Sequence, residues 1–324
     1  MPNLSSLENK AYSELMAREA KYAKMLQLQL ANSLTLIYGV MKKVYNQYAV
    51  NGKLTRAQMT AYNKYSTMEK QILDSLDPAI KANIETIKHL LPTQFQAAFF
   101  QYAWAIDQAS GLRLSWGLVN TKALLGAFDI DNPKNIELKN ALKKNYPLEA
   151  RKKIRSVLLN GLSIGQSYNQ MANDLKVVLS KIHSSALLIV RTEAQTALNA
   201  GQSLVYQRAI DNGIQGSEIW SATKDGRTRY DHWKMDGAKR IVEGGRDGWI
   251  VIDGSFALGP GGDWAPYPGY PGLRASERCN CRCHTRFQID GYEPQLMRTR
   301  AEGVIPYQNY QDYAEQYHPD WLKI

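Results

Sequence analysis

The stretch SSALLIVRTEAQTALNAGQSLVYQRAIDNG, residues 184–213, decides the fold of the C-terminal half of this chain. Its apolar and small residues recur at helical spacing, which predicts one long helix. Ser184 or Ser185 can cap the start of this helix, because a serine hydroxyl accepts a hydrogen bond from a free backbone N–H of the first turn. Gly213 supplies the left-handed residue that commonly ends a helix.

Short strands are predicted downstream of this helix. Residues 219–223 (IWSAT) alternate as in a strand, and Asp225-Gly226 suits a tight turn. Further short strands are predicted at residues 240–242, 249–252 and 281–289. A long helix against a small antiparallel sheet makes this region α+β.

A glycine- and proline-rich segment interrupts the predicted strands. Ten of the 20 residues in 253–272 are Gly or Pro, interleaved with aromatic residues. This composition predicts an extended loop, and its aromatic residues favour a loop that docks on another surface over a bare linker.

The N-terminal part is predicted to be almost entirely helical. An apolar stripe runs from about Ser5 to Tyr48, and Asn51-Gly52 ends it. Thr55 caps a second helix, Asp77-Pro78 begins a third, and Thr93 opens a fourth after Leu91-Pro92. Asn132-Pro133 and Tyr146-Pro147 begin two more, Gly161 closes the latter, and Ser163-x-x-Gln166 is a capping box for the next helix. The predicted fold class is α+β, with a mostly helical N-terminal part followed by a small α+β C-terminal domain.

Five motifs in a fixed order characterise residues 150–290. They are GLSIGQSYNQMANDL from Gly161, RTE-x5-N from Arg191, a strand that ends in Ala222-Thr223, DGRTR-x2-H-x3-DG from Asp225, and NCRC from Asn280. In this order they resemble the phage Mu F-like head morphogenesis (minor capsid) family. The family pattern often has a His and a Pro before NCRC, where this chain has Arg278 and Cys279. That departure argues against a metal site built on the missing histidine.

The resemblance implies a minor capsid protein of a tailed phage, and not an enzyme. Such a protein is expected to associate with the portal protein, other head proteins and packaged double-stranded DNA during head assembly. Its expected location is the virion, in the phage head near the portal vertex, after assembly in the host cytoplasm and without a membrane. The alternative is an enzyme carried in the virion, either ADP-ribosyltransferase-like or a metal-dependent nuclease.

The length and composition fit this class. A chain of 324 residues is long enough for two domains. It has no 18-residue apolar run, and its first residues lack the layout of a signal peptide, so a soluble protein is expected. The predicted division is a helical, partner-binding region (1–135), a basic helical connector (136–183), a Mu F-like α+β domain (184–290) and a C-terminal tail (291–324).

Positive charge is concentrated in the N-terminal part. The formal net charge is +10; residues 1–180 carry 23 Lys or Arg against 13 Asp or Glu, whereas residues 181–324 carry 17 of each. A basic cluster of seven residues can neutralise phosphates and predicts DNA binding; the alternative is a solvated helix face. The cluster consists of Lys139, Lys143, Lys144, Arg151, Lys152, Lys153 and Arg155.

Seven tyrosines lie between residues 12 and 65. Tyrosine is amphipathic and suits a surface that becomes buried against a partner, so these helices are predicted to contact one. The alternative is tyrosines at the edge of an ordinary bundle core.

All three cysteines lie within residues 279–283. An odd number of clustered cysteines argues against a disulfide framework and fits a reducing compartment. Cys279, Cys281 and Cys283, together with His232, are candidate ligands of a zinc ion. Alternating residues of a strand place their sulfur atoms too far apart unless the backbone bends, so buried free thiols are the alternative.

The remaining polar residues of this region are predicted to form a structural network of polar contacts, which we call the structural knot. It consists of Arg191, Glu193, Asp225, Arg227, His232 and Asp236. An Arg and a Glu are also ingredients of ADP-ribosyltransferases. Arg191 and Glu193, however, are two residues apart on a helix and point to different faces. A salt bridge from Arg191 to Asp225 or Asp236 is therefore preferred, and no catalytic residue is assigned.

Overall fold

The computed structural model describes residues 4–114, 116, 136–223, 227–229, 232–233, 235–243, 246–251, 263–290, 297–299, 303–305 and 315. The chain divides into two compact units. The mixed unit combines Met1–Glu19, Leu90–Phe128 and Arg191–Ile324, and the helical unit combines Ala20–His89 and Asp129–Val190. Three long helices, α1 (Leu4–Tyr48), α3 (Tyr65–Ser110) and α7 (Tyr168–Asp211), each contribute residues to both units.

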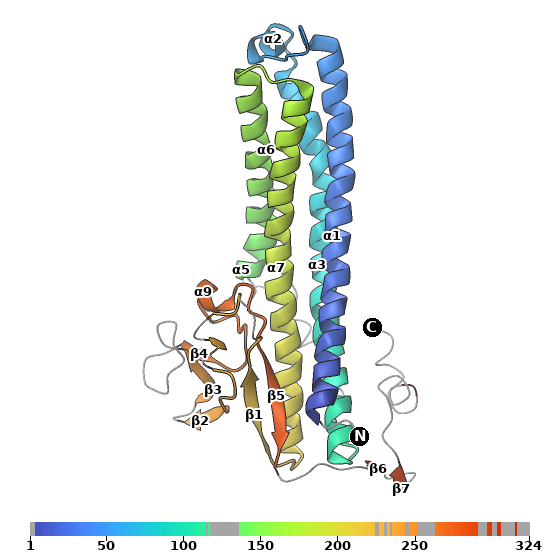
Figure 1. Cartoon of the computed structure of the whole chain (residues 1–324), viewed down its shortest axis with the longest axis vertical. Coiled ribbons are helices and arrows are strands. Elements are labelled where there is room, and N and C mark those ends of the chain that lie inside the picture. Colours follow the sequence, from blue (N-terminus) through green and yellow to red (C-terminus); the bar gives the residue numbers. More distant parts are fainter. Residues whose placement is uncertain are drawn as a thin grey trace. The chain divides into compact units, whose positions relative to one another are not determined.

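The helical unit is built from four helices that lie side by side (Figure 1). They are the parts of α1, α3 and α7 that belong to this unit, together with α6 (Tyr146–Ser163). Each helix contributes an apolar stripe to one shared core, represented by Ile37, Ile72, Ile154 and Leu175, all fully buried. Shorter elements complete the unit: α2 (Arg56–Ala61), α5 (Ile136–Lys139) and the π-helix η2 (Asn140–Asn145).

Several helix ends follow the predicted local signals. The first helix ends at Tyr48, and Asn51 (φ 49°) and Gly52 (φ 71°) form the left-handed turn that follows it. Thr55 caps α2 through a capping box with Gln58. Gly213 (φ 88°) follows the end of α7. These predictions are confirmed because each depends only on residues close in sequence.

The predicted breaks at Pro78 and Pro92 are wrong, since α3 continues through both prolines. An internal proline loses one helical hydrogen bond and costs about 3 kcal/mol. The apolar stripe of α3, however, is buried on both sides of Pro78, with Ile72 and Ile80 in the same core. Burial along the whole helix outweighs the local loss.

The predicted serine caps are also wrong. Helix α7 begins at Tyr168, and its capping box consists of Ser167 and Gln170. Ser163 lies in the last turn of α6, and Ser184 and Ser185 lie inside α7. Each of these three hydroxyls donates to the carbonyl four residues earlier, which a helix interior permits. Gly161 lies within α6 and does not close it. The predicted start at Asn132-Pro133 falls outside the described residues.

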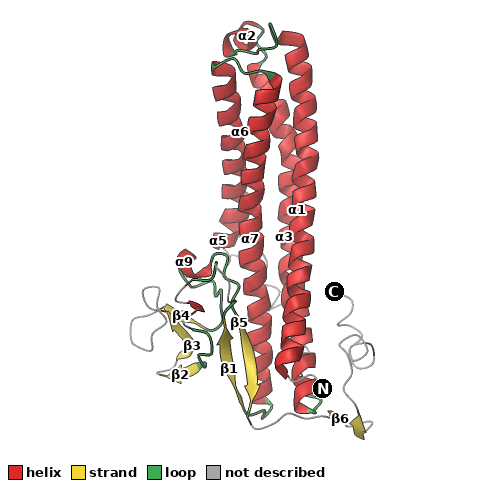
Figure 2. Ribbon diagram, in the orientation of Figure 1, coloured by secondary structure: helices red, strands yellow, loops and turns green. Residues whose placement is uncertain are grey.

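The mixed unit contains the strands (Figure 2). Strands β1 (Gly216–Ser221) and β5 (His284–Ile289) pair antiparallel, with Gly216 opposite Ile289 and Ser221 opposite His284. A three-stranded antiparallel sheet has the order β2 (Ile241–Glu243), β3 (Arg246–Val251) and β4 (Asp263–Ala265). The short helix α9 (Ala275–Arg278) precedes β5, and β6 (Met297–Thr299) pairs with β7 (Gly303–Ile305).

The core of the mixed unit joins segments from the whole chain. Leu15 of α1, Phe99 of α3, Tyr206 of α7 and Phe287 of β5 belong to one buried cluster. Helices α3 and α7 approach each other closely at Gly201, where an added Cβ would lie 2.6 Å from the carbonyl oxygen of Phe95. A larger residue at position 201 would therefore collide with the α3 backbone.

The predicted fold class, α+β with a mostly helical N-terminal part and a small C-terminal sheet, is confirmed. The division into four sequence segments stays a prediction. Among the described helices, none combines the length and apolar character needed to cross a bilayer.

Three of the N-terminal tyrosines use their hydroxyls inside their own unit. Tyr12 donates to the carbonyl of Arg282, Tyr38 to that of Ala172, and Tyr45 to that of Gln166. These tyrosines hold the fold together, so the alternative of tyrosines at the edge of a core describes them better than a partner surface.

Candidate functional site

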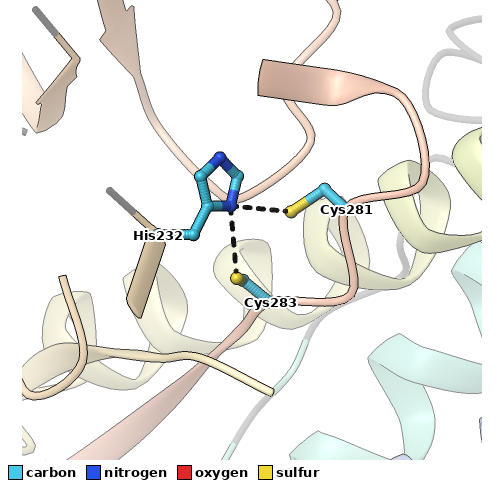
Figure 3. Close-up of side chains that lie close together, drawn as sticks. All are labelled: His232, Cys281 and Cys283. Carbon is cyan, nitrogen blue, oxygen red and sulfur yellow. Dashed lines mark hydrogen bonds between the residues drawn. The ribbon is translucent and has the colours of Figure 1, made fainter. Parts of the chain in front are cut away.

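A buried histidine faces two buried cysteines in the mixed unit (Figure 3). The Nδ1 atom of His232 lies 3.4 Å from Sγ of Cys283 and 3.5 Å from Sγ of Cys281. The three side chains are only 2%, 3% and 2% exposed for His232, Cys281 and Cys283. We call these three residues the thiol–histidine cluster.

The other ring nitrogen of His232 has a carboxylate partner. Its Nε2 atom lies 3.1 Å from Oε2 of Glu277, a buried residue of α9. The ring of Trp220 meets the imidazole edge-on, with 5.9 Å between the ring centroids. His232 is therefore held in one orientation by contacts to both of its ring nitrogens and by the ring of Trp220.

A left-handed residue lies directly before the two buried cysteines. Cys281 and Cys283 lie in the turn before β5 and not within it, so the predicted strand over residues 281–289 begins too early. Asn280 adopts a left-handed conformation (φ 56°), which Asn tolerates better than most residues, and its N–H donates to Oγ1 of Thr192. The sulfur atoms of Cys281 and Cys283 lie within 4.8 Å of each other, so both can face the same histidine.

Polar side chains of α7 hold this turn in place. Asn199 Nδ2 donates to the carbonyl oxygens of Cys283 (2.9 Å) and Pro268 (2.7 Å), and Gln195 Nε2 also donates to Cys283 (3.0 Å). Thr196 donates to the carbonyl of Gly269. The end of the predicted Gly- and Pro-rich loop thus docks on α7, within the same unit as the cluster.

The two buried thiols differ in acidity. The hydrogen bond from Cys283, with the neighbouring His232, lowers the pKa of the Cys281 thiol well below its ordinary value, although burial opposes this shift. The hydrogen bond to Cys281 and burial both raise the pKa of the Cys283 thiol. One sulfur of the pair is therefore poised to be a thiolate, the form in which cysteine binds metals.

Only some of the predicted zinc ligands, and only some residues of the predicted structural knot, lie close together in the structure. His232, Cys281 and Cys283 come together, whereas Cys279 is outside the cluster and only half-buried. Glu193 pairs with Arg278, and Asp236 Oδ1 accepts a hydrogen bond from the N–H of Ala222 at 3.0 Å.

Among the described residues, Arg191 pairs with a carboxylate that was not predicted. Its Nε atom lies 3.8 Å from Oε1 of Glu19 in α1, an ion pair that sequence reasoning missed. Asp225 falls outside the described residues, so its role stays a prediction, and Arg227 lies at an exposed position.

The basic cluster is partly neutralised within the helical unit. Arg151 pairs with Asp77, Arg155 pairs with Glu69, and Lys152 lies 3.2 Å from Glu149. Lys143 and Lys144 are exposed on η2. Lys139 is half-buried, and Lys153 lines a cavity of about 260 Å³ together with Tyr146 and Ile189. DNA binding by this cluster stays a prediction.

Two buried carboxylates with specific partners were not predicted from the sequence. Glu277 contacts His232, and Glu8 is buried against Tyr206 and Phe287. Neither stands in a motif, and their partners are far away in the sequence, so no local signal pointed to them.

Comparisons with known proteins agree with the resemblance that the ordered motifs indicate. Residues 152–286 match the family model described as Phage Mu protein F like protein. Minor head protein GP7 of Bacillus phage SPP1 is 26% identical over 297 residues, which are 90% of this chain and 92% of that protein. An NAD(+)–arginine ADP-ribosyltransferase of Enterococcus faecalis, EFV, is 25% identical over 316 residues, which are 95% of this chain but 61% of that protein. No solved structure matched the chain.

The matched residues contain α7, β1, the thiol–histidine cluster and the first half of β5. The region with the five ordered motifs is thus the region that the family model covers. Over residues 152–286, this chain is thus similar to the phage Mu F-like protein family.

Proposed function

We propose that this chain is a minor head protein of a tailed phage, a structural component of the virion that joins the head during assembly. The observation that carries the proposal is the match to a minor head protein along nearly the whole length of both chains. The long helices support it, because they present extended faces to other head proteins. The proposed partners are the portal protein and the packaged DNA.

One face of α1 in the helical unit suits a protein partner. Met25, Leu28 and Leu36 are 41%, 56% and 56% exposed. At 100° per residue, their side chains fall within about 80° of one another around the helix. Exposed large apolar residues on one stripe favour a surface that becomes covered in an assembly. We assign this stripe to contact with the portal protein.

The stripe gives a direct test of the proposed function. We expect Leu28→Asp with Leu36→Asp to abolish incorporation into heads and co-purification with the portal protein, because two charges would have to be desolvated in the contact. Gln27→Asp with Ala31→Asp is the matched control, since it adds the same charge at exposed positions off the stripe of the same helix. Both variants should have the unfolding midpoint of the wild type. Normal incorporation of the stripe variant would contradict the assignment.

DNA contact is tested through its salt dependence. We expect the double variant Lys143→Ala with Lys144→Ala to bind DNA with a weaker salt dependence. The slope of log affinity against log salt concentration should decrease in magnitude by about 0.9 for each lost phosphate contact. Arg151→Ala with Arg155→Ala should have a smaller effect, because both arginines already pair with carboxylates. Lys42→Ala with Lys43→Ala removes two exposed charges from α1 and should leave the slope unchanged. Equal slopes in all variants would show that the cluster is a solvated face.

The alternative function is an enzyme of the virion. Similarity to a protein named as an ADP-ribosyltransferase favours it, but 39% of that protein has no counterpart in the match. Glu193, the acid considered for catalysis, forms an ion pair with Arg278. A nuclease would need an accessible metal, whereas the thiol–histidine cluster is buried. The structural function is therefore the better supported of the two.

A further inference from the structure

We propose that His232, Cys281 and Cys283 bind a zinc ion that fastens the turn before β5 to the segment between β1 and β2. This inference is independent of the head-protein function. It differs from the sequence prediction in leaving out Cys279 and in adding Glu277 as a residue that positions the histidine.

The spacing of the donor atoms fits tetrahedral zinc. Zinc lies about 2.3 Å from a thiolate sulfur and about 2.0 Å from an imidazole nitrogen, so a tetrahedral angle places sulfur and nitrogen about 3.5 Å apart. The observed distances from His232 Nδ1 to the two sulfur atoms are 3.4 and 3.5 Å. All donor atoms of the three residues lie within 4.8 Å of one another.

The contact between His232 and Glu277 is compatible with metal binding through the other ring nitrogen. A neutral imidazole carries one N–H, and its Nε2 atom faces the carboxylate of Glu277 at 3.1 Å. A proton on Nε2 satisfies that carboxylate and leaves a lone pair on Nδ1, which is aimed at two sulfur atoms. A lone pair beside two cysteine sulfur atoms can coordinate a metal ion, and both cysteines bind a metal as thiolates. A carboxylate on the far nitrogen is the partner that orients metal-bound histidines.

The chemistry of the ligands selects the metal. Two thiolates and one imidazole suit zinc, whereas carboxylate and carbonyl oxygens would suit magnesium or calcium. Tetrahedral zinc would need a fourth ligand in addition to these three residues. Their burial points to a structural role, because a catalytic zinc keeps a position open to substrate.

The local core explains why a metal would be useful here. The hydrophobic cluster around the site has five buried members: Trp220, Ala222, Met235, Cys281 and Cys283. A metal bound only in the folded state would add its binding free energy to the stability of this small cluster. The described cysteines are all free, so a metal is the cross-link that these residues can supply.

The test is the metal content of the full-length chain after purification and dialysis. We expect one zinc per chain, retained by Cys279→Ser and lost from Cys281→Ser and Cys283→Ser. Cys279 is the matched control, since it is the same residue type two positions away and outside the cluster. Replacement of zinc by cobalt(II) should give a thiolate-to-cobalt charge-transfer band and the intense visible bands of a tetrahedral site. Less than about one tenth of a zinc per chain, with no such spectrum, would overturn the proposal.

A second variant keeps the proposal testable if the cysteine variants do not fold. Glu277→Gln leaves all three ligands in place and removes the carboxylate that orients His232. We expect its zinc affinity, measured by competition with a chromophoric chelator, to fall about 10- to 100-fold while the cobalt spectrum keeps its thiolate band. Loss of zinc from Cys279→Ser, or a disulfide between Cys281 and Cys283 in the purified protein, would contradict the ligand assignment.

Discussion

Replacing Asn199 with aspartate is expected to lower the free energy of unfolding by about 3–5 kcal/mol. The side chain of Asn199 is fully buried, and its Nδ2 atom donates to the carbonyl oxygens of Pro268 and Cys283 at 2.7 and 2.9 Å. Aspartate has nearly the same shape but offers an acceptor in place of this donor. An ionised carboxylate would face two carbonyl oxygens without water, and a buried charge without a partner is costly.

Denaturant unfolding at neutral pH measures this loss. The matched control is Asn212→Asp, because Asn212 makes the same kind of bond, from Nδ2 to the carbonyl of Arg208 at 2.7 Å, at an exposed position. The control should change stability by no more than about 1 kcal/mol. Similar losses in the two variants would show that the bonds from Asn199 do not hold the turn before β5.

Glu8→Gln is expected to remove a fall in stability that the wild type shows as the pH rises toward 8. Burial raises the pKa of Glu8 from 4.5 to about 8, although hydrogen bonds from Tyr206 and from the N–H of Phe287 oppose the shift. The unfolded carboxyl loses its proton near 4.5, whereas the folded one keeps it until about 8. The folded state therefore binds more protons in this window, and its stability falls as the pH rises through it.

The window from pH 7 to 8 isolates this effect. Burial also raises the pKa of Glu19, to about 7, which acts in the same direction at lower pH. Burial lowers the pKa of His284 to about 4, so stability from this group falls as the pH drops from 6.5 to 4. Between pH 7 and 8 the wild type should lose on the order of 1 kcal/mol relative to Glu8→Gln.

Urea unfolding at closely spaced pH values checks this expectation. Glu14→Gln is the control, since Glu14 is an exposed residue of the same helix. This variant should keep the slope of the wild type. A Glu8→Gln protein with the same pH dependence as the wild type would show that another group titrates in the window.

Local signals made several features predictable. The end of α1 near Tyr48, the Thr55 cap of α2 and the glycine after α7 all depend on residues within one or two turns. The strand near Ile219 could be recognised by alternation, because half-buried strands repeat every two residues. The order of the motifs along the chain also located the region that the family model matches, because motif order is a property of the sequence alone.

Local helix propensity gave wrong helix ends where packing between residues far apart in the sequence determines the structure. Pro78 and Pro92 end helices in most sequences, yet α3 passes through both because its apolar stripe is buried along its length. Likewise, α7 does not begin at Ser184, since the same helix continues upstream to Tyr168. A local signal can be outweighed by burial that involves many residues at once.

The sequence by itself determined the helical and α+β character of the chain, its charge asymmetry and the residue types available for a site. Only the tertiary structure decided which of these residues meet. His232 is 51 residues from Cys283 and 45 from Glu277, and Glu8 is 279 residues from Phe287. Such contacts depend on the way α1, α7 and β5 pack in one unit, and no periodicity or spacing along the chain encodes the distance between residues so far apart.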